Sequence, residues 1–465
     1  MSKFRRASSR LGAVLLGLAV VVPWLPATPA TAAGYTTING AGSTWSAIAI
    51  DQWQADVARQ GIPVNYNAQG STAGRVFYYS DQVDFAASEI PFQAAYRDST
   101  GTVTTNEIAL AAHRPWAYLP DVAGGTSLMY HIDVSGQRVT NLRLSPASVA
   151  KIFTGVITNW NDAAITADNG GRQLPSLPIK PTIRSDGSGT TAQFTAFMAS
   201  QTPSIWNSFC QRVGITLNPC PATSLYPPFN GSVAQQLSDG VAAFVAAPYN
   251  NGAITYVEYG YAKQRGFPVA SLLNRAGYYT QPTALNVAIA LTGARIHADF
   301  TQDLSGVYVN PDPRTYPMSS YSYLIVPKTT VAGFTTDKGR SLGAFILYVV
   351  CAGQTKAAQL GYSPLPKNLV EFAFAAEKLI PGAPAPPPIN QCSNPTITGA
   401  FNLQNAPPPP PGSGIHDAVP PGPGQGGPTP AGSNNGRRSN TTSKAATATT
   451  TATTIANGLS GSETQ

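Results

Sequence analysis

The sequence predicts an α/β protein, because short apolar strands alternate along it with helices that have one apolar face. In chain order these runs are a helix over 46–60, strands over 64–67, 83–87 and 179–183, a helix after Thr190, strands over 253–257 and 323–326, and a helix over 339–351. The region that carries them spans about 350 residues, which exceeds the usual size of one hydrophobic core. We therefore expect two lobes.

Composition and charge exclude several classes of protein. Of the 465 residues 43% are hydrophobic, which is too many for a wholly disordered chain. Only 11% are charged, a low share that is common in exported proteins. The formal net charge is +7, but four of the basic residues are Lys3, Arg5, Arg6 and Arg10 at the N-terminus. Because the remaining chain has no run of Lys and Arg, we expect no nucleic-acid partner.

Residues 1–33 are expected to be a secretory signal peptide. They combine a basic start, an apolar run from Leu11 to Leu25 and the small-residue sequence Ala30-Thr31-Ala32, which suits cleavage. A retained membrane helix is the alternative, but the run is short and Pro23 interrupts it. We expect an exported protein that is extracellular, periplasmic or associated with the cell wall. No cysteine lies near this site, so no lipid anchor is evident.

Four cysteines, Cys210, Cys220, Cys351 and Cys392, remain in a chain expected to meet an oxidising environment. Three pairings are possible, and the spacing favours Cys210 with Cys220 and Cys351 with Cys392. A metal site is the alternative. The sequence has no Cys-x-x-Cys and its four histidines are scattered, so we expect neither a metal nor another cofactor.

The composition changes near residue 381, where proline, glycine and then threonine become dominant. Such a segment cannot bury enough apolar surface to offset the entropy of ordering it. We therefore expect 383–465 to be a disordered tail. A wall-spanning stalk, a glycosylated region and a plain extension all remain open for it.

Three polar segments with glycines each follow a strand or precede a helix: 40–45, 69–74 and 184–191. A helix N-terminus offers free N–H groups and partial positive charge, and glycine lets an anion approach the main chain. Arg184 adds a forked cationic donor that suits oxyanions. Taken alone, each segment is usually only a helix cap. No Gly-Lys-Ser/Thr occurs, and Ser188 lacks both the G-x-S-x-G pattern and identifiable His and Asp partners of a hydrolase.

Several ordered motifs identify a family that these segments resemble. They include Gly-Ala-Gly-Ser-Thr-Trp at 40–45, Gly-Ser-Thr-Ala-Gly at 70–74, Val-Asp-Phe-Ala-Ala-Ser-Glu-Ile-Pro at 83–91, Ile-Thr-Asn-Trp-Asn-Asp at 157–162, Arg-Ser-Asp-Gly-Ser-Gly-Thr-Thr at 184–191 and Asp-Gly-Val-Ala-Ala-Phe-Val at 239–245. With them, the chain from about Ile38 to Lys378 resembles the extracytoplasmic phosphate-binding proteins that serve the high-affinity Pst phosphate ABC transporter.

The resemblance implies a two-lobed periplasmic-binding-protein fold of type II, with a cleft between the lobes. Lobe I would comprise 35–118 and 317–380, and lobe II 119–316. It also implies a monomer that is not an enzyme, binds inorganic phosphate in the cleft and delivers it to the membrane permease of an ABC transporter. The phosphate donors carried over from the family are Thr44, Trp45, Ser71, Arg184, Ser188, Gly189 and Thr190, with Asp186 orienting the arginine.

Glu89 departs from the family pattern, which commonly has Asp at this position. There the carboxylate accepts a hydrogen bond from protonated phosphate and rejects sulfate, because two facing acceptors are costly in a desolvated site. The extra methylene of Glu89 moves the acceptor by roughly 1.5 Å. We expect Glu89 to contact the phosphate with altered affinity or selectivity. The alternative is that Glu89 turns away from the ligand.

Two other functions are compatible with the sequence. A secreted phosphate scavenger or surface protein, not coupled to transport, would explain the missing lipid-attachment cysteine and the long tail. An extracellular phosphatase could use the same anion site, but no metal cluster, paired base or nucleophile supports it.

Overall fold

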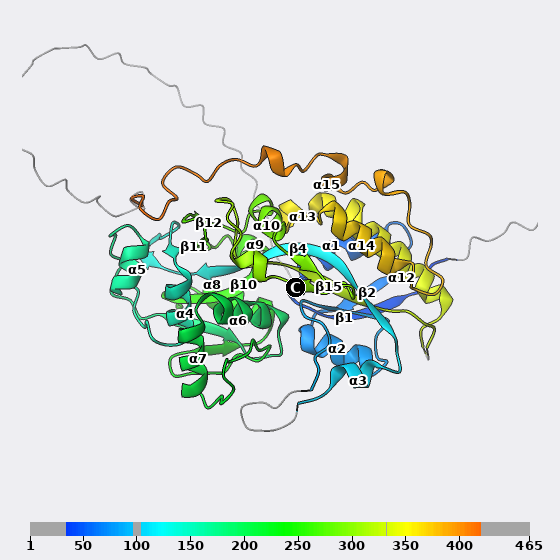
Figure 1. The fold of residues 1–465 in the computed structure, drawn as a ribbon, viewed down its shortest axis with the longest axis horizontal. Coiled ribbons are helices and arrows are strands. Elements are labelled where there is room, and N and C mark those ends of the chain that lie inside the picture. Colours follow the sequence, from blue (N-terminus) through cyan, green and yellow to red (C-terminus); the bar gives the residue numbers. More distant parts are fainter. Residues whose placement is uncertain (1–33, 96–103, 332, 420–465) are drawn as a thin grey trace, which may run out of the picture. The chain divides into compact units, whose positions relative to one another are not determined.

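The computed structural model describes residues 34–95, 104–331 and 333–419 (Figure 1). The expected signal peptide, and the tail from residue 420 onward, lie outside these residues. Eight strands form one mixed sheet in the order β2-β1-β3-β15-β4-β10-β8-β9, so the α/β prediction is confirmed. Its strands are β1 (Ile38–Gly42), β2 (Val64–Asn67), β3 (Phe85–Ser88), β4 (Trp116–Tyr130), β8 (Lys180–Arg184), β9 (Val233–Gln235), β10 (Ala253–Glu258) and β15 (Ser319–Pro327).

Smaller sheets and the helices complete the described part of the chain. The short strands are β5 (Asp133–Val134), β6 (Gln137–Arg138), β7 (Arg143–Leu144), β11 (Ser271–Leu273), β12 (Tyr279–Thr280), β13 (Arg295–Ile296) and β14 (Gln302–Asp303). The α-helices are α1 (Ala47–Ala58), α2 (Ser71–Tyr79), α3 (Glu107–Ala111), α4 (Pro146–Phe153), α5 (Ala163–Asp168), α6 (Gly189–Gln201), α7 (Pro203–Arg212), α8 (Leu237–Ala246), α9 (Tyr259–Gln264), α10 (Ala284–Leu291), α11 (Ser305–Tyr308), α12 (Thr336–Val350), α13 (Ala357–Leu360), α14 (Lys367–Glu377) and α15 (Pro395–Thr398), with 3-10 turns η1 (Ala352–Lys356), η2 (Ile389–Gln391) and η3 (Leu403–Asn405).

The long strand β4 connects two halves of the main sheet. From Trp116 to Gly125 it pairs antiparallel with β15, and from Thr126 to Tyr130 it pairs antiparallel with β10. On one side of β4 the strands β2, β1 and β3 are parallel to one another, and on the other side β10, β8 and β9 are parallel. Ligands of open α/β sheets bind outside the carboxyl ends of such parallel strands. A ligand-binding site is therefore expected in the segments that follow β1, β3 and β8.

A β-bulge interrupts the pairing of β4 with β15. Tyr321 pairs with Ala123 and Tyr323 pairs with Pro120, so Asp121 and Val122 of β4 together face the single residue Ser322. A bulge of this kind redirects side chains and is frequent beside functional sites.

Helix α12 belongs to the hydrophobic core. Thr335 caps its N-terminus by accepting the Lys338 N–H at 3.3 Å, and its apolar face is buried. The stretch Thr336–Leu360 has 25 residues and contains an 18-residue window with a mean hydropathy of 1.2, so it is long and apolar enough to cross a membrane. Its α-helical conformation breaks at Cys351, and most of that window is buried inside the protein, as is typical of a core helix.

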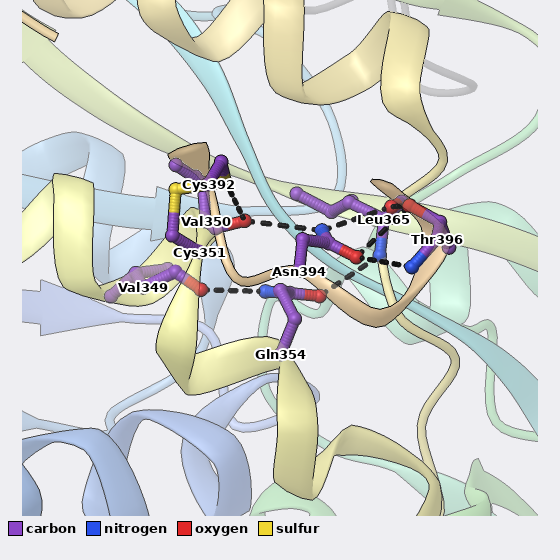
Figure 2. Close-up of a disulfide and its surroundings, with 8 residues drawn as sticks. All are labelled: Val349, Val350, Cys351, Gln354, Leu365, Cys392, Asn394 and Thr396. Atoms are coloured by element: carbon purple, nitrogen blue, oxygen red, sulfur yellow. Dashed lines mark hydrogen bonds between the residues drawn. A yellow bond between two sulfur atoms is a disulfide. The ribbon is translucent and has the colours of Figure 1, made fainter. Parts of the chain in front are cut away.

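Both favoured disulfide pairings are confirmed, Cys210–Cys220 and Cys351–Cys392. The second joins the end of α12 to the proline-rich region (Figure 2). Beside it, the fully buried side chain of Asn394 donates hydrogen bonds to the carbonyl oxygens of Val350 and Leu365, both at 3.1 Å. The proline-rich chain is thus fixed to the folded body at this point.

The structure corrects the expected start of the disordered tail. Residues 381–419, here called the C-terminal segment, lie along the body rather than apart from it (orange in Figure 1). Arg314 donates to the Ala406 carbonyl at 3.1 Å, Arg143 donates to the Asp417 carbonyl at 2.8 Å, and Gly414 forms a β-bridge with Tyr278. Composition alone misassigned the segment, because a disulfide, hydrogen bonds to its main chain and the packing of Ile389 and Ile397 against the core hold it to the body.

Candidate anion-binding site

The three glycine-bearing segments converge at the carboxyl ends of strands. The first runs from the end of β1 into the turn before α1, the second leads into α2, and the third runs from the end of β8 into α6. The Gly189 N–H donates to Ser71 Oγ at 3.1 Å, and the Thr72 N–H donates to the Gly187 carbonyl at 3.2 Å. The Gly70 N–H donates to the Gly42 carbonyl at 2.8 Å. Residues far apart in the sequence therefore form one buried site.

Two glycines in these segments allow close contacts that a side chain would block. A Cβ on Gly189 would lie 2.1 Å from Glu89 Oε2 and 2.8 Å from Ser71 Oγ. Gly70 has a φ of +93°, and a Cβ there would lie 2.8 Å from an oxygen of Asp186. Glycine at these positions lets polar groups approach the start of α2 and α6.

Glu89 points into this site and accepts hydrogen bonds from three serines. It follows β3 directly, and its side chain is buried. Oε1 accepts from the hydroxyls of Ser43 and, at 3.1 Å, Ser322. Oε2 accepts from Ser71 Oγ at 2.6 Å. These three hydroxyl donors satisfy the oxygens of a carboxyl group that is shielded from water.

Arg184 forms the cationic part of the site. Its Nε donates to Asp186 Oδ1 at 2.8 Å and its Nη2 donates to Asp186 Oδ2, so the pair is held at two points. Nη1 donates to Ser238 Oγ at 3.1 Å, and this hydroxyl lies 2.8 Å from Thr44 Oγ1. Burial alone would raise the pKa of Asp186, but hydrogen bonds and charge from Arg184, with the Leu237 N–H, hold that pKa below its usual value. Asp186 is therefore ionised and fixes the guanidinium.

Three further residues that were expected to donate to phosphate, Ser188, Thr190 and Trp45, also lie at the site, where they have roles in the protein's own structure. Ser188 caps α6 by accepting the Thr191 N–H at 3.2 Å, and Thr190 is buried in the first turn of that helix. The Trp45 N–H donates to Ser43 Oγ at 2.9 Å, and its indole donates to Thr126 Oγ1 at 3.3 Å. In this conformation Trp45 supports the turn after β1.

Four polar residues at the site were missed by sequence reasoning: Ser43, Ser238, Ser322 and Asp121. Ser43 lies inside the first glycine-bearing segment, so its position was a usable signal. Ser238 follows Leu237, which has a φ of +63°, at the start of α8. The other two reach the site through the register of β4 and β15, which no local pattern reveals.

A cavity of about 520 Å³ opens beside Glu89. Its lining includes Gln193 and Gln302, whose side-chain amides donate to the Glu89 carbonyl at 2.8 and 3.4 Å. Among the described residues, no group of three or more His, Cys, Asp or Glu side chains is arranged to hold a metal ion. Taken together, the hydroxyls, the N–H groups of α6 and Arg184 are suited to an oxyanion, and Glu89 is suited to accept a hydrogen bond from a protonated one.

Comparisons with known proteins agree with this chemistry. Residues 27–352 match the model of a PBP superfamily domain. The chain is 31% identical over 340 residues to the phosphate-binding protein PstS of Xylella fastidiosa strain Temecula1, which covers 72% of this chain and 83% of the relative. It is 30% identical over 355 residues to phosphate-binding protein PstS 2 of Mycobacterium tuberculosis strain H37Rv, covering 75% and 88%.

Solved structures of other proteins have a fold similar to that of this chain. A high affinity periplasmic phosphate-binding protein (PfluDING) bound with phosphate aligns with a TM-score of 0.55 at 20% identity, covering 73% of this chain and 93% of that one. The ancestral soluble variant of the Human Phosphate Binding Protein aligns with a TM-score of 0.54 at 18% identity, covering 75% and 99%. At these identities the likeness establishes the architecture alone.

Proposed function

Because the chain belongs to the PBP superfamily and, within it, to the PstS phosphate-binding proteins, we propose that its buried site binds inorganic phosphate outside the cytoplasmic membrane for uptake. One observation carries the proposal: Arg184, fixed by Asp186, and the N-terminus of α6 meet the hydroxyls of Ser71 and Ser238 in one buried place. Such preorganised donors replace the water around an anion without having to be reordered when it binds. The relatives are named as binding proteins and not as enzymes.

In this proposal the donors to phosphate are Thr44, Trp45, Ser71, Arg184, Ser188, Gly189 and Thr190. Their N–H and O–H groups surround the oxyanion, and Arg184 supplies the positive charge. Glu89 accepts a hydrogen bond from the protonated phosphate. Because Ser71 donates to Glu89 in the present conformation, phosphate binding requires this hydroxyl to exchange one acceptor for another. Ser238 is added as a group that positions Arg184.

We further propose that 35–118 with 317–380 form one lobe and 119–316 the other, as a monomer that closes over phosphate and docks on the permease of an ABC transporter. Support comes from β4, which pairs with β15 of the first group and then with β10 of the second. Rotation about a strand shared in this way is a form of hinge closure.

Titration calorimetry tests the function. The protein is unfolded with its disulfides intact, dialysed to remove copurified anion, refolded and titrated with phosphate, alone and in excess sulfate. Tight binding that sulfate leaves unchanged is the expected result. Failure to bind phosphate, or equal binding of sulfate, contradicts the proposal.

A further inference from the structure

A second buried carboxyl group, Asp121, lies behind Glu89. The bulge in β4 sets Asp121 opposite Ser322 of β15. The Ser322 hydroxyl donates to Glu89 Oε1 at 3.1 Å. All three side chains are almost completely buried. Ser322 therefore lies between the carboxyl group of Asp121 on β4 and that of Glu89, which follows β3.

The surroundings of Asp121 favour its neutral form. Oδ1 accepts the Val122 N–H at 2.7 Å, whereas Oδ2 has no hydrogen-bond partner among the described residues. No lysine, arginine or histidine of the described residues lies within ion-pair distance of it. Burial, and then the negative charge of Glu89, raise the pKa of Asp121 to about 8. At neutral pH Asp121 therefore carries a proton.

The two tyrosines that interact with Asp121 keep their protons in this range. Tyr66 and Tyr362 interact electrostatically with it from β2 and from the loop before α14, and burial raises the pKa of each well above its usual value. Glu258 of β10, the strand next to the second half of β4, is buried with its pKa well above the usual value. Glu89 is the carboxyl group of the site that acts electrostatically on Asp121, and an anion beside Glu89 adds to this effect.

We propose that Asp121, acting through Ser322 and Glu89, couples binding of the anion to uptake of a proton. This inference rests on the proposed function. An anion at Glu89 brings more negative charge toward Asp121, so the ligand-bound protein keeps the Asp121 proton to a higher pH than the free protein does. By linkage, affinity falls above about pH 8, by up to about tenfold per pH unit for one linked proton.

The test is calorimetric titration with inorganic phosphate from neutral pH to about pH 9.5, in two buffers with different heats of ionisation. In the upper part of this range the free ligand remains a dianion, so any proton taken up comes to the protein. The native protein is expected to bind more weakly as the pH rises, with a heat that depends on the buffer. Asp121→Asn keeps the shape of the side chain without the titration, and its affinity should stay constant. Equal proton uptake by the two proteins overturns the proposal.

Two further variants separate coupling from folding. Glu377→Gln removes another buried carboxyl group, in α14, and should behave as the native protein. Ser322→Ala removes the hydroxyl that lies between the two carboxyl groups, so the pH at which the affinity falls should change; an unchanged profile contradicts the connection. Absence of phosphate binding at neutral pH overturns the function as well, whereas tight binding with a flat profile overturns the coupling alone.

Discussion

Arg184 and Asp186 are two residues apart and form a two-point ion pair at the carboxyl end of β8. The carboxylate takes Nε and Nη2, so the remaining face of the guanidinium, with Nη1, is directed to Ser238 and the neighbouring Thr44. Only a planar, forked cation can be held along one edge and still donate from another. The sequence Arg-Ser-Asp thus fixes both the charge and the direction of the donor.

Arg184→Ala is expected to weaken phosphate binding by about 10- to 150-fold, because charge-assisted hydrogen bonds worth ~1.5–3 kcal/mol are lost. Calorimetry on the refolded protein measures the effect. Arg314→Ala is the matched control, because Arg314 forms the same kind of two-point pair with Asp312 on the same chain. Unchanged affinity in Arg184→Ala would reject Arg184 as a phosphate ligand.

Glu89→Asp shortens the side chain and withdraws the carboxylate from Ser71, which leaves that hydroxyl free for the ligand. We expect tighter phosphate binding and sharper discrimination against sulfate. Glu89→Gln, which has the same length but adds an N–H donor, should admit sulfate. Competition titrations with the two anions check both variants. Loss of discrimination in Glu89→Asp would show that this reading of Glu89 is wrong.

Breaking Cys351–Cys392 by Cys392→Ser with Cys351→Ser is expected to lower the free energy of unfolding by about 2–4 kcal/mol, because it opens a long loop. It should also expose the C-terminal segment to protease. Urea unfolding and mass spectrometry of limited digests measure the two effects. The Cys210–Cys220 disulfide joins residues that are only 10 positions apart, and its removal should leave the C-terminal segment resistant to protease. Equal susceptibility of the two variants would contradict the role of the second disulfide.

Glu377 makes the stability of the protein depend on pH. Burial raises its pKa from 4.5 to about 7, and neither of its oxygens has a hydrogen-bond partner among the described residues. Because the pKa of Glu377 is higher in the folded protein than in the unfolded chain, the free energy of unfolding is highest below the unfolded pKa of 4.5. It falls as the pH rises toward 7, where the folded protein must also lose the proton. Urea denaturation of Glu377→Gln at several pH values should show a smaller fall in stability than the native protein between about pH 4 and 7. Parallel curves would contradict this.

Local patterns predicted the elements whose apolar spacing is regular. The strands at 64–67 and 253–257 and the helix at 46–60 were found within two residues of their ends. The 15-residue strand β4 was not predicted, because Pro120 and the pair Gly124-Gly125 interrupt its apolar run with turn-forming residues. The strand forms nevertheless, because pairing with β15 and β10 supplies the stability that its low strand propensity does not.

The residues of the site also fall into those that local patterns predict and those that depend on long-range contacts. Its glycine-bearing segments and Arg184 have local signatures, so sequence and family resemblance indicated them. Ser322 and Asp121 depend on a two-against-one register between strands about 200 residues apart, which appears only once the sheet is assembled. The ordered C-terminal segment was missed for a related reason, because the buried Asn394 and the disulfide beside it are long-range contacts.

The disulfide at Cys392 also limits how far the C-terminal segment can detach from the body. Beyond Cys392 the segment is held by non-covalent contacts, among them the Arg143 hydrogen bond to the Asp417 carbonyl and the bridge between Gly414 and Tyr278. If these contacts open, the covalent bond to Cys351 still joins Cys392 to the end of α12. The chain up to Cys392 therefore stays attached whatever the residues after it do.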